Sequence, residues 1–183
     1  MAKPLPQGYV NLDRLFNKIT DNRKIESVLE LCCAEGKYIG YLQGKGFTAE
    51  GIESDLEKIQ NGNGYPLHRG ELTELETIMA GRQFDVIVAN NVLTVNAQMR
   101  HLSTDYPLGH LLPSSRAFHK SVNLHIEKII QCAHNLLAPG GLLIATGAAI
   151  GPLYRIGFSQ EAAESLGYNV LVYMANRAVL EKV

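Results

Sequence analysis

The sequence predicts an α/β protein whose mostly parallel sheet of seven strands ends in an antiparallel hairpin. Short apolar runs alternate with helical patterns along most of the 183 residues, which is typical of stacked βα units. The last two apolar runs, YNVLVYMA and RAVLEKV, follow each other almost directly. Strands joined so closely must be antiparallel, because a parallel pair needs a crossover connection. We expect one domain over residues 1–183.

The first half of the chain contains three expected strands and the helices between them. Apolar residues recur at helical spacing over 10–20, which predicts an amphipathic leading helix. A second helix follows the first strand and ends near Gly44 and Gly46. The expected strands cover residues 27–32, 48–53 and, more weakly, 65–70.

Two short helices in this half are expected to begin at capping boxes. Ser54 is followed three residues later by Glu57, and Thr73 by Glu76. In each pair the hydroxyl and the carboxylate can satisfy backbone N–H groups that a helix start leaves free. The pairs therefore predict helix starts after the second and third strands.

The second half begins with FDVIVAN, residues 84–90, an almost continuous apolar run that predicts a strand covered on both faces. Residues 94–113 have no clear periodicity. A long amphipathic helix is expected over 115–137, and APGG is expected to end it before a fifth strand at 141–147. A short helix at 159–166 precedes the hairpin.

Composition excludes several classes of protein. The 17 basic and 18 acidic residues give a net charge of -1. The chain therefore has no excess of positive charge to attract phosphate backbones, and a nucleic-acid partner is disfavoured. The three cysteines are Cys32, Cys33 and Cys132, and their spacing predicts neither a disulfide framework nor a metal site. No apolar segment is long enough for a signal core or a membrane span, so a cytoplasmic location is expected.

Five short stretches at the expected strand ends form an ordered pattern. They are ELCCAEG after the first strand, GIESD after the second, RGEL after the third, FDVIVANNVL at the fourth and LLAPGGLLIA before the fifth. In this order they resemble the motifs of class I S-adenosylmethionine-dependent methyltransferases. The resemblance covers nearly the whole chain and implies a Rossmann-like methyltransferase fold.

The first of these stretches departs from the family pattern. Glu30 stands in the position of the acidic residue, and Gly36 matches the third glycine of the family's loop. Cys32 and Ala34 stand where the first two glycines usually lie. Both are small enough for a close approach of the backbone to a cofactor, but we expect neither to adopt the positive φ that glycine allows.

The resemblance implies S-adenosylmethionine as the cofactor, bound at the carboxyl ends of the strands. It places Glu30 near the ammonium or sulfonium group, Glu53 at the ribose diol and Glu71 near the adenine amine. Ser54, after the second strand, and Asn90, at the end of the fourth, are expected to contact the cofactor as well. So are Cys32, Ala34 and Gly36 of the first loop.

The acceptor is expected to be a small molecule, bound mainly by residues 94–114. The aperiodic stretch and the first turn of the long helix contain His101 and His119, and we expect His119 first and His101 second to act as base or substrate contact. Asn91 is the polar residue best placed near the transferred methyl group. Tyr154, after the fifth strand, is a further candidate contact.

Two alternatives remain open at this stage. Residues 1–25 are expected to cover the cofactor as a lid, but the altered glycine loop is also compatible with a non-catalytic cofactor-binding or partner subunit. Another enzyme that uses the same cofactor, a lyase or an aminopropyl transferase, is the second alternative. The absence of an acidic pair after the fourth strand argues against the aminopropyl transferase.

Overall fold

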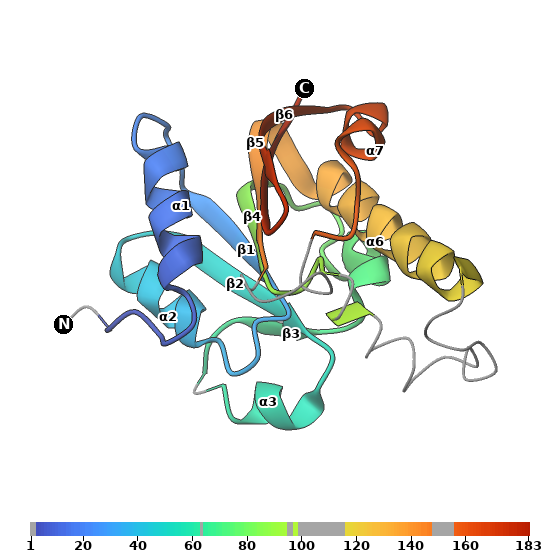
Figure 1. Ribbon diagram of the computed structural model, residues 1–183. Coiled ribbons are helices and arrows are strands. Elements are labelled where there is room, and N and C mark those ends of the chain that lie inside the picture. The colour runs from blue at the N-terminus through green and yellow to red at the C-terminus, as the bar shows by residue number, and fades with distance from the viewer. Residues whose placement is uncertain (1–2, 63, 95–96, 99–115, 148–155) are drawn as a thin grey trace.

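The computed structural model describes residues 3–62, 64–94, 97–98, 116–147 and 156–183. Its centre is a seven-stranded sheet with the order β3-β2-β1-β4-β5-β7-β6 (Figure 1). β1 to β5 pair in parallel, whereas β7 is antiparallel to both β5 and β6. The predicted fold class is confirmed. The strands are β1 Ser27–Leu31, β2 Thr48–Glu53, β3 Leu67–Arg69, β4 Phe84–Asn90, β5 Leu137–Thr146, β6 Tyr168–Met174 and β7 Arg177–Lys182.

The strand order reverses between β1 and β4. The chain builds outward from β1 through β2 to β3, then returns to place β4 on the other side of β1. In open α/β sheets, the loops that leave the carboxyl ends of strands diverge at such a reversal and leave a crevice between them. The fold therefore predicts a binding site at the carboxyl ends of β1, β2 and β4.

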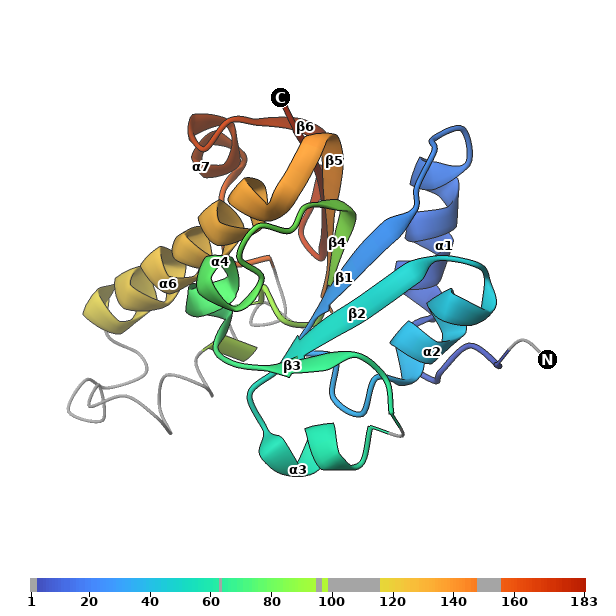
Figure 2. The same cartoon turned by 180° about the vertical axis from the view of Figure 1, so that it is seen from behind.

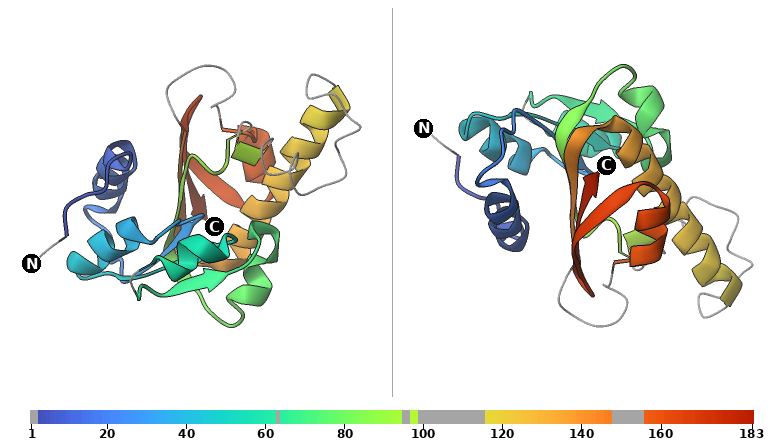
Figure 3. Two further views of the ribbon diagram at one scale, coloured as in Figure 1. Left: turned by 90° about the horizontal axis from the view of Figure 1, so that it is seen from below. Right: turned by 90° about the horizontal axis from the view of Figure 1, so that it is seen from above.

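Helices cover both faces of the sheet. Figures 2 and 3 show α1 and α2 on one face, with α4, α6 and α7 on the other. The helices are α1 Val10–Thr20, α2 Lys37–Gly44, α3 Leu56–Gln60, α4 Leu75–Ile78, α6 Arg116–Leu136 and α7 Gln160–Ser165, and a 3-10 helix, η1 Leu72–Glu74, leads into α4. Because both faces are covered, the central strands are apolar almost throughout, as FDVIVAN indicates.

Two cores hold these layers together, one on each face. β1 contributes to both, since Val28 packs under α1 and α2 while Leu29 packs under α6. Phe16 and Leu12 of α1 are fully buried, and each contributes about 1.5–3 kcal/mol of hydrophobic burial. The opposite side of α1 carries exposed Arg14. The leading helix is thus fixed against the sheet with one polar side free.

The two predicted capping boxes are wrong. The N-cap of α3 is Asp55, whose carboxylate accepts from Glu57 N at 3.0 Å, because the helix begins one residue later than the pair Ser54–Glu57 requires. Ser54 instead donates its backbone N–H to Glu53. Thr73 lies inside the 3-10 helix η1, and α4 begins without a side-chain cap. The Asp55 carboxylate competes with the adjacent Ser54 hydroxyl for the N–H groups at the helix start, which explains the first error.

The segment LAPGG also differs from expectation. Leu136 ends α6, but β5 begins at once with Leu137, so the expected helix stop lies inside the strand. Phe84 pairs with Leu137 and Val86 with Leu142, and the register shift between these pairs accommodates the extra residues as a bulge. A backbone φ of 72° at Gly140 makes this excursion possible.

The described part of the chain contains no helix with the length and apolar character that crossing a membrane requires.

Candidate functional site

A cavity of about 260 Å³ lies at the carboxyl ends of β1, β2 and β4, where the strand order predicts a crevice. We call it the strand-end cavity. It brings together six of the residues predicted from the sequence with residues of the α6 layer. The described residues that line it are Cys32, Ile52, Glu53, Ser54, Gly70, Glu71, Leu72, Asn90, Asn91, Val92, Ala97, Gln98 and His125.

The loop after β1 has an unusual backbone conformation. Cys32 and Ala34 adopt φ values of 52° and 49°, and Gly36 adopts 71°. The expectation that Cys32 and Ala34 do not take positive φ is therefore wrong. An L-residue in this region costs about 1–2 kcal/mol because its Cβ crowds the following carbonyl. The loop keeps a glycine-type conformation although two of its three positions have side chains, so other contacts must hold it.

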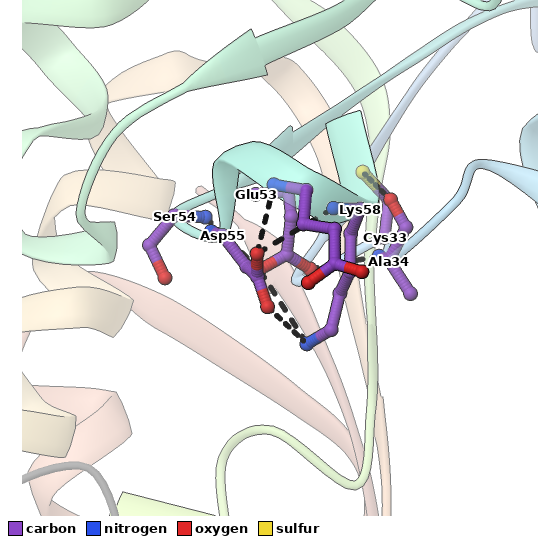
Figure 4. Close-up of polar contacts among 7 residues, drawn as sticks. Cys33, Ala34, Glu53, Ser54, Asp55 and Lys58 are labelled. Atoms are coloured by element: carbon purple, nitrogen blue, oxygen red, sulfur yellow. Dashed lines mark hydrogen bonds and ion pairs between the residues drawn. The ribbon is translucent and has the colours of Figure 1, made fainter. Parts of the chain in front are cut away.

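Glu53 is the residue that holds this loop (Figure 4). The residue is 5% exposed, and its carboxylate accepts the backbone N–H of Ala34 at 2.9 Å. It also accepts the N–H groups of Ser54 at 3.0 Å and Asp55 at 3.1 Å, and Lys58 Nζ lies 4.0 Å away. A carboxylate has about four acceptor positions, so one is left for a ligand. Glu53 joins the loops after β1 and β2 at the wall of the strand-end cavity.

Glu30 is buried with no cation beside it among the described residues. The residue is 1% exposed, neither carboxylate oxygen has a partner within hydrogen-bond distance, and the Tyr9 hydroxyl is the polar group that faces it. Burial raises the pKa of Glu30 to about 8; the Tyr9 hydroxyl opposes this rise, and the charge of Glu53 adds to it. The buried Tyr38 hydroxyl also has no partner within hydrogen-bond distance, and the centroids of the stacked Tyr38 and Tyr9 rings lie 4.6 Å apart. Glu30 does not line the strand-end cavity but lies on the side of β1 that α2 covers.

The polar residues at the end of β4 tie three segments together. Asn90 Oδ1 accepts from Thr146 Oγ1 at 2.9 Å, and Asn90 Nδ2 donates to the Gly8 carbonyl at 3.3 Å. Asn91 has a φ of 61° and donates its backbone N–H to the Thr146 carbonyl at 2.7 Å. The ends of β4 and β5 and the N-terminal segment therefore meet at one edge of the strand-end cavity.

Residues 9–150 match the family model described as a methyltransferase domain. The chain belongs to this methyltransferase family. The match spans the leading helix, the loop after β1, the strand-end cavity and β5, so the site described above lies within the matched region.

Solved methyltransferases share the fold of this methyltransferase domain at low sequence identity. CalS10, an amino pentose methyltransferase from Micromonospora echinaspora, is 13% identical with a TM-score of 0.63, over 97% of this chain and 92% of that one. The sugar N-methyltransferase KedS8 from Streptoalloteichus is 12% identical with a TM-score of 0.62, over 96% and 88%. Magnesium protoporphyrin IX methyltransferase from Synechocystis is 11% identical with a TM-score of 0.57, over 96% and 77%.

None of the curated protein sequences matches the chain. The family model therefore carries the assignment to the methyltransferases, and the solved structures show the fold.

The structure places at the cavity a histidine that is not among the site residues predicted from the sequence. His125 lines the strand-end cavity from α6. It stands three residues after Val122 and four before Ile129, so helical spacing already put it on the side of α6 that faces the sheet. Gln98, also missed, is buried and donates to the Val92 carbonyl at 2.9 Å. The segment that contains Gln98 has no periodicity from which its burial could be predicted.

The predicted acid–base candidates are not placed by the structure. His101 and Tyr154 lie outside the described residues. The backbone of His119 lies in the first turn of α6, but the structure does not describe its side chain. Among the described residues, no group of three or more His, Cys, Asp or Glu side chains is arranged to hold a metal ion.

Replacing Ala34 with glycine is expected to raise the free energy of unfolding by about 0.5–1 kcal/mol. The substitution removes the steric cost of positive φ, and the greater freedom of glycine in the unfolded chain offsets part of the gain. Urea unfolding measures the change. Gly36→Ala is the matched control and is expected to destabilise, because a Cβ there meets Leu67 Cδ2 and Tyr65 Cδ2 at 2.9 Å. A loss of stability in Ala34→Gly would contradict the left-handed conformation of Ala34.

Proposed function

We propose that this chain is an S-adenosylmethionine-dependent methyltransferase with a small-molecule acceptor. The observation that carries the proposal is the buried Glu30 carboxyl group, which has no partner within hydrogen-bond distance and is faced by the Tyr9 hydroxyl. An ionised acid that is buried without a counter-charge destabilises the fold by several kcal/mol, and a cationic ligand at this family motif would offset that cost. S-adenosylmethionine is such a ligand, with an ammonium and a sulfonium group, and its methyl group is already activated for transfer.

The residues around the strand-end cavity fit the remaining parts of this cofactor. The fourth acceptor position of Glu53 suits one ribose hydroxyl, and Glu71, which is half-buried in the cavity wall, suits the adenine amine. Ser54 and Asn90 contribute polar groups to the same wall. The backbone of Cys32, Ala34 and Gly36 is held in the conformation that lets a loop approach a ligand closely.

The lid proposal follows from the position of Tyr9, next to the start of α1. The Tyr9 ring stacks on Tyr38 close to the Glu30 carboxylate. We propose that the segment within residues 1–25 that carries Tyr9 covers the ammonium or sulfonium end and excludes water from it. Exclusion of water strengthens the attraction between Glu30 and a bound cation.

Methyl transfer to the oxygen, nitrogen or carbon of the acceptor is proposed to be an in-line displacement, for which the protein chiefly aligns the nucleophile. Asn91 and residues 94–114 are proposed to position the acceptor. His119 and His101 stay the proposed bases, and a base is needed only when the acceptor carries a proton at the working pH. The similarity to amino pentose and sugar methyltransferases supports a small acceptor.

Calorimetric titration with S-adenosylmethionine, S-adenosylhomocysteine and NAD tests the cofactor. We expect micromolar binding of the first two and none of NAD, since the loop after β1 is anchored to Glu53 and offers no phosphate-binding glycine pattern. Transfer of a labelled methyl group to mixtures of small metabolites then tests catalysis. Absence of binding by both adenosyl compounds overturns the proposal. Binding without transfer to any acceptor supports the non-catalytic subunit.

A further inference from the structure

A second hollow, of about 430 Å³, lies between α1 and the β6–β7 hairpin. We call it the cationic groove because its lining includes Arg14, Lys18 and Arg177, and none of its described lining residues is acidic. Its apolar wall comes from α1 and β6. The described residues that line it are Asn11, Arg14, Leu15, Lys18, Ile19, Thr146, Gly147, Val172, Met174, Asn176 and Arg177.

The three cations of the groove lie together without a carboxylate partner among the described residues, whereas several cations elsewhere on the described surface are paired. Arg23 pairs with Glu181 at 2.7 Å and Lys24 with Glu26 at 2.6 Å, and similar pairs hold Lys37, Lys58 and Arg82. By contrast, no carboxylate among the described residues lies within 4.0 Å of Arg14, Lys18 or Arg177. Like charges gathered in one hollow repel each other, so a bound anion would stabilise them.

The groove adjoins the strand-end cavity. Thr146 lines the groove and donates its hydroxyl to Asn90, which lines the strand-end cavity. This hydrogen-bonded pair at the ends of β4 and β5 is shared between the two hollows. The two hollows therefore lie on either side of this one pair of side chains.

The walls of the groove are well anchored. α1 is fixed by the buried Leu12 and Phe16, which places Arg14 and Lys18 one helical turn apart on its free side. Arg177 begins β7, and its Nε donates to Met174 Sδ at 3.0 Å across the hairpin turn. Charges held on two rigid elements that face each other suit a compact anion with several negative charges.

We propose that the cationic groove binds the anionic end of the methyl acceptor, and that this end is a phosphate ester or diphosphate. The inference rests on the proposed function and adds the chemical class of its substrate. Two guanidinium groups match the oxygens of a phosphate in pairs, and Lys18 supplies a third charge. Leu15, Ile19 and Val172 offer apolar contact to the rest of the molecule.

Calorimetric titration with inorganic pyrophosphate at low ionic strength tests the groove without any cofactor. We expect binding that Arg14→Ala, Lys18→Ala or Arg177→Gln each weakens roughly 5- to 30-fold, since each removes charge-assisted hydrogen bonds to the anion. Lys120→Ala is the matched control: it removes the same charge from exposed helix surface on the opposite face of the sheet. Its affinity for pyrophosphate should equal that of the wild-type protein.

Titration of the same variants with S-adenosylmethionine separates this inference from the proposed function. The groove variants should keep the cofactor affinity of the wild-type protein, because the three cations lie outside the strand-end cavity. No pyrophosphate binding, or an equal loss in Lys120→Ala, overturns the inference whatever the cofactor does. Binding of succinate in place of pyrophosphate, with the same dependence on Arg14 and Arg177, overturns the phosphate assignment and identifies a carboxylate acceptor.

Discussion

Glu30→Gln is expected to stabilise the protein by roughly 2–4 kcal/mol near pH 8, while it weakens the binding of S-adenosylmethionine at least about tenfold. The stabilisation arises because the amide is uncharged and costs less to bury than a carboxylate without hydrogen bonds. The loss of affinity arises because the same carboxylate is the proposed partner of the cofactor's positive charge. One substitution thus separates the requirements of the fold from those of the site.

The pH dependence of this effect has a defined sign. The pKa of Glu30 is raised from its ordinary 4.5 to about 8, chiefly by burial. Between these values the folded protein holds a proton that the unfolded chain has released, so its stability falls as the pH rises through this window. The wild-type protein is expected to lose stability from about pH 5 to about pH 8, and Glu30→Gln to lose much less. Urea unfolding across this range measures both slopes.

Glu50→Gln is the matched control for this substitution. Glu50 is also buried, but its carboxylate is paired with Arg82 and hydrogen-bonded to His68. Removal of its charge leaves the guanidinium of Arg82 without its partner, so this variant is expected to be less stable than the wild-type protein. If Glu30→Gln and Glu50→Gln change the free energy of unfolding in the same direction, the lack of a charged partner at Glu30 does not explain the effect of Glu30→Gln.

Cofactor binding provides an independent readout of the Glu30 proton. If the carboxyl is largely protonated near pH 7 and must ionise to hold a cation, binding of S-adenosylmethionine releases a proton. Calorimetry in two buffers of different ionisation enthalpy detects this release. Glu30→Gln should bind without it. A wild-type titration free of proton release at pH 7 would rule out the proposed contact between Glu30 and the cofactor.

The sequence predicted the elements of the fold well because their patterns are local. The leading helix and the strands at 48–53 and 84–90 have the predicted bounds, and each depends on a few neighbouring apolar residues. The caps failed where two local acceptors compete, as Ser54 and Asp55 do. Periodicity shows that a residue is buried or exposed, but it does not show which of two adjacent polar groups a helix start uses.

The site was less predictable, since its geometry depends on contacts between distant parts of the chain. Nothing local in CCAEG indicates that Cys32 and Ala34 adopt positive φ, because the bond that holds Ala34 comes from Glu53, nineteen residues away. The cationic groove joins α1 to Arg177 at the other end of the sequence, and only the position of β7 beside β5 brings them together. The spacing of residues along the sequence does not predict contacts between segments that lie so far apart.

Glu53→Ala is expected to abolish detectable cofactor binding and to destabilise the protein by about 2–4 kcal/mol. The substitution removes the acceptor of three backbone N–H groups, those of Ala34, Ser54 and Asp55. Buried donors left without an acceptor cost about 1–3 kcal/mol each, and water reaching the open cavity offsets part of that sum. The strained conformation of Ala34 then loses the bond that stabilises it, and the loop after β1 should relax.

Hydrogen exchange at the Ala34 amide separates this explanation from a general loss of stability. In the wild-type protein that N–H is bonded to Glu53 and should exchange slowly, whereas in Glu53→Ala it should exchange faster than the amides of β1 and β4. Glu57→Ala, an exposed acid of the adjacent helix α3, removes the same charge and should leave both exchange and affinity unchanged. Unaltered affinity and protection in Glu53→Ala would mean that the loop keeps its shape without the carboxylate, and the ligand contact at Glu53 would fall with it.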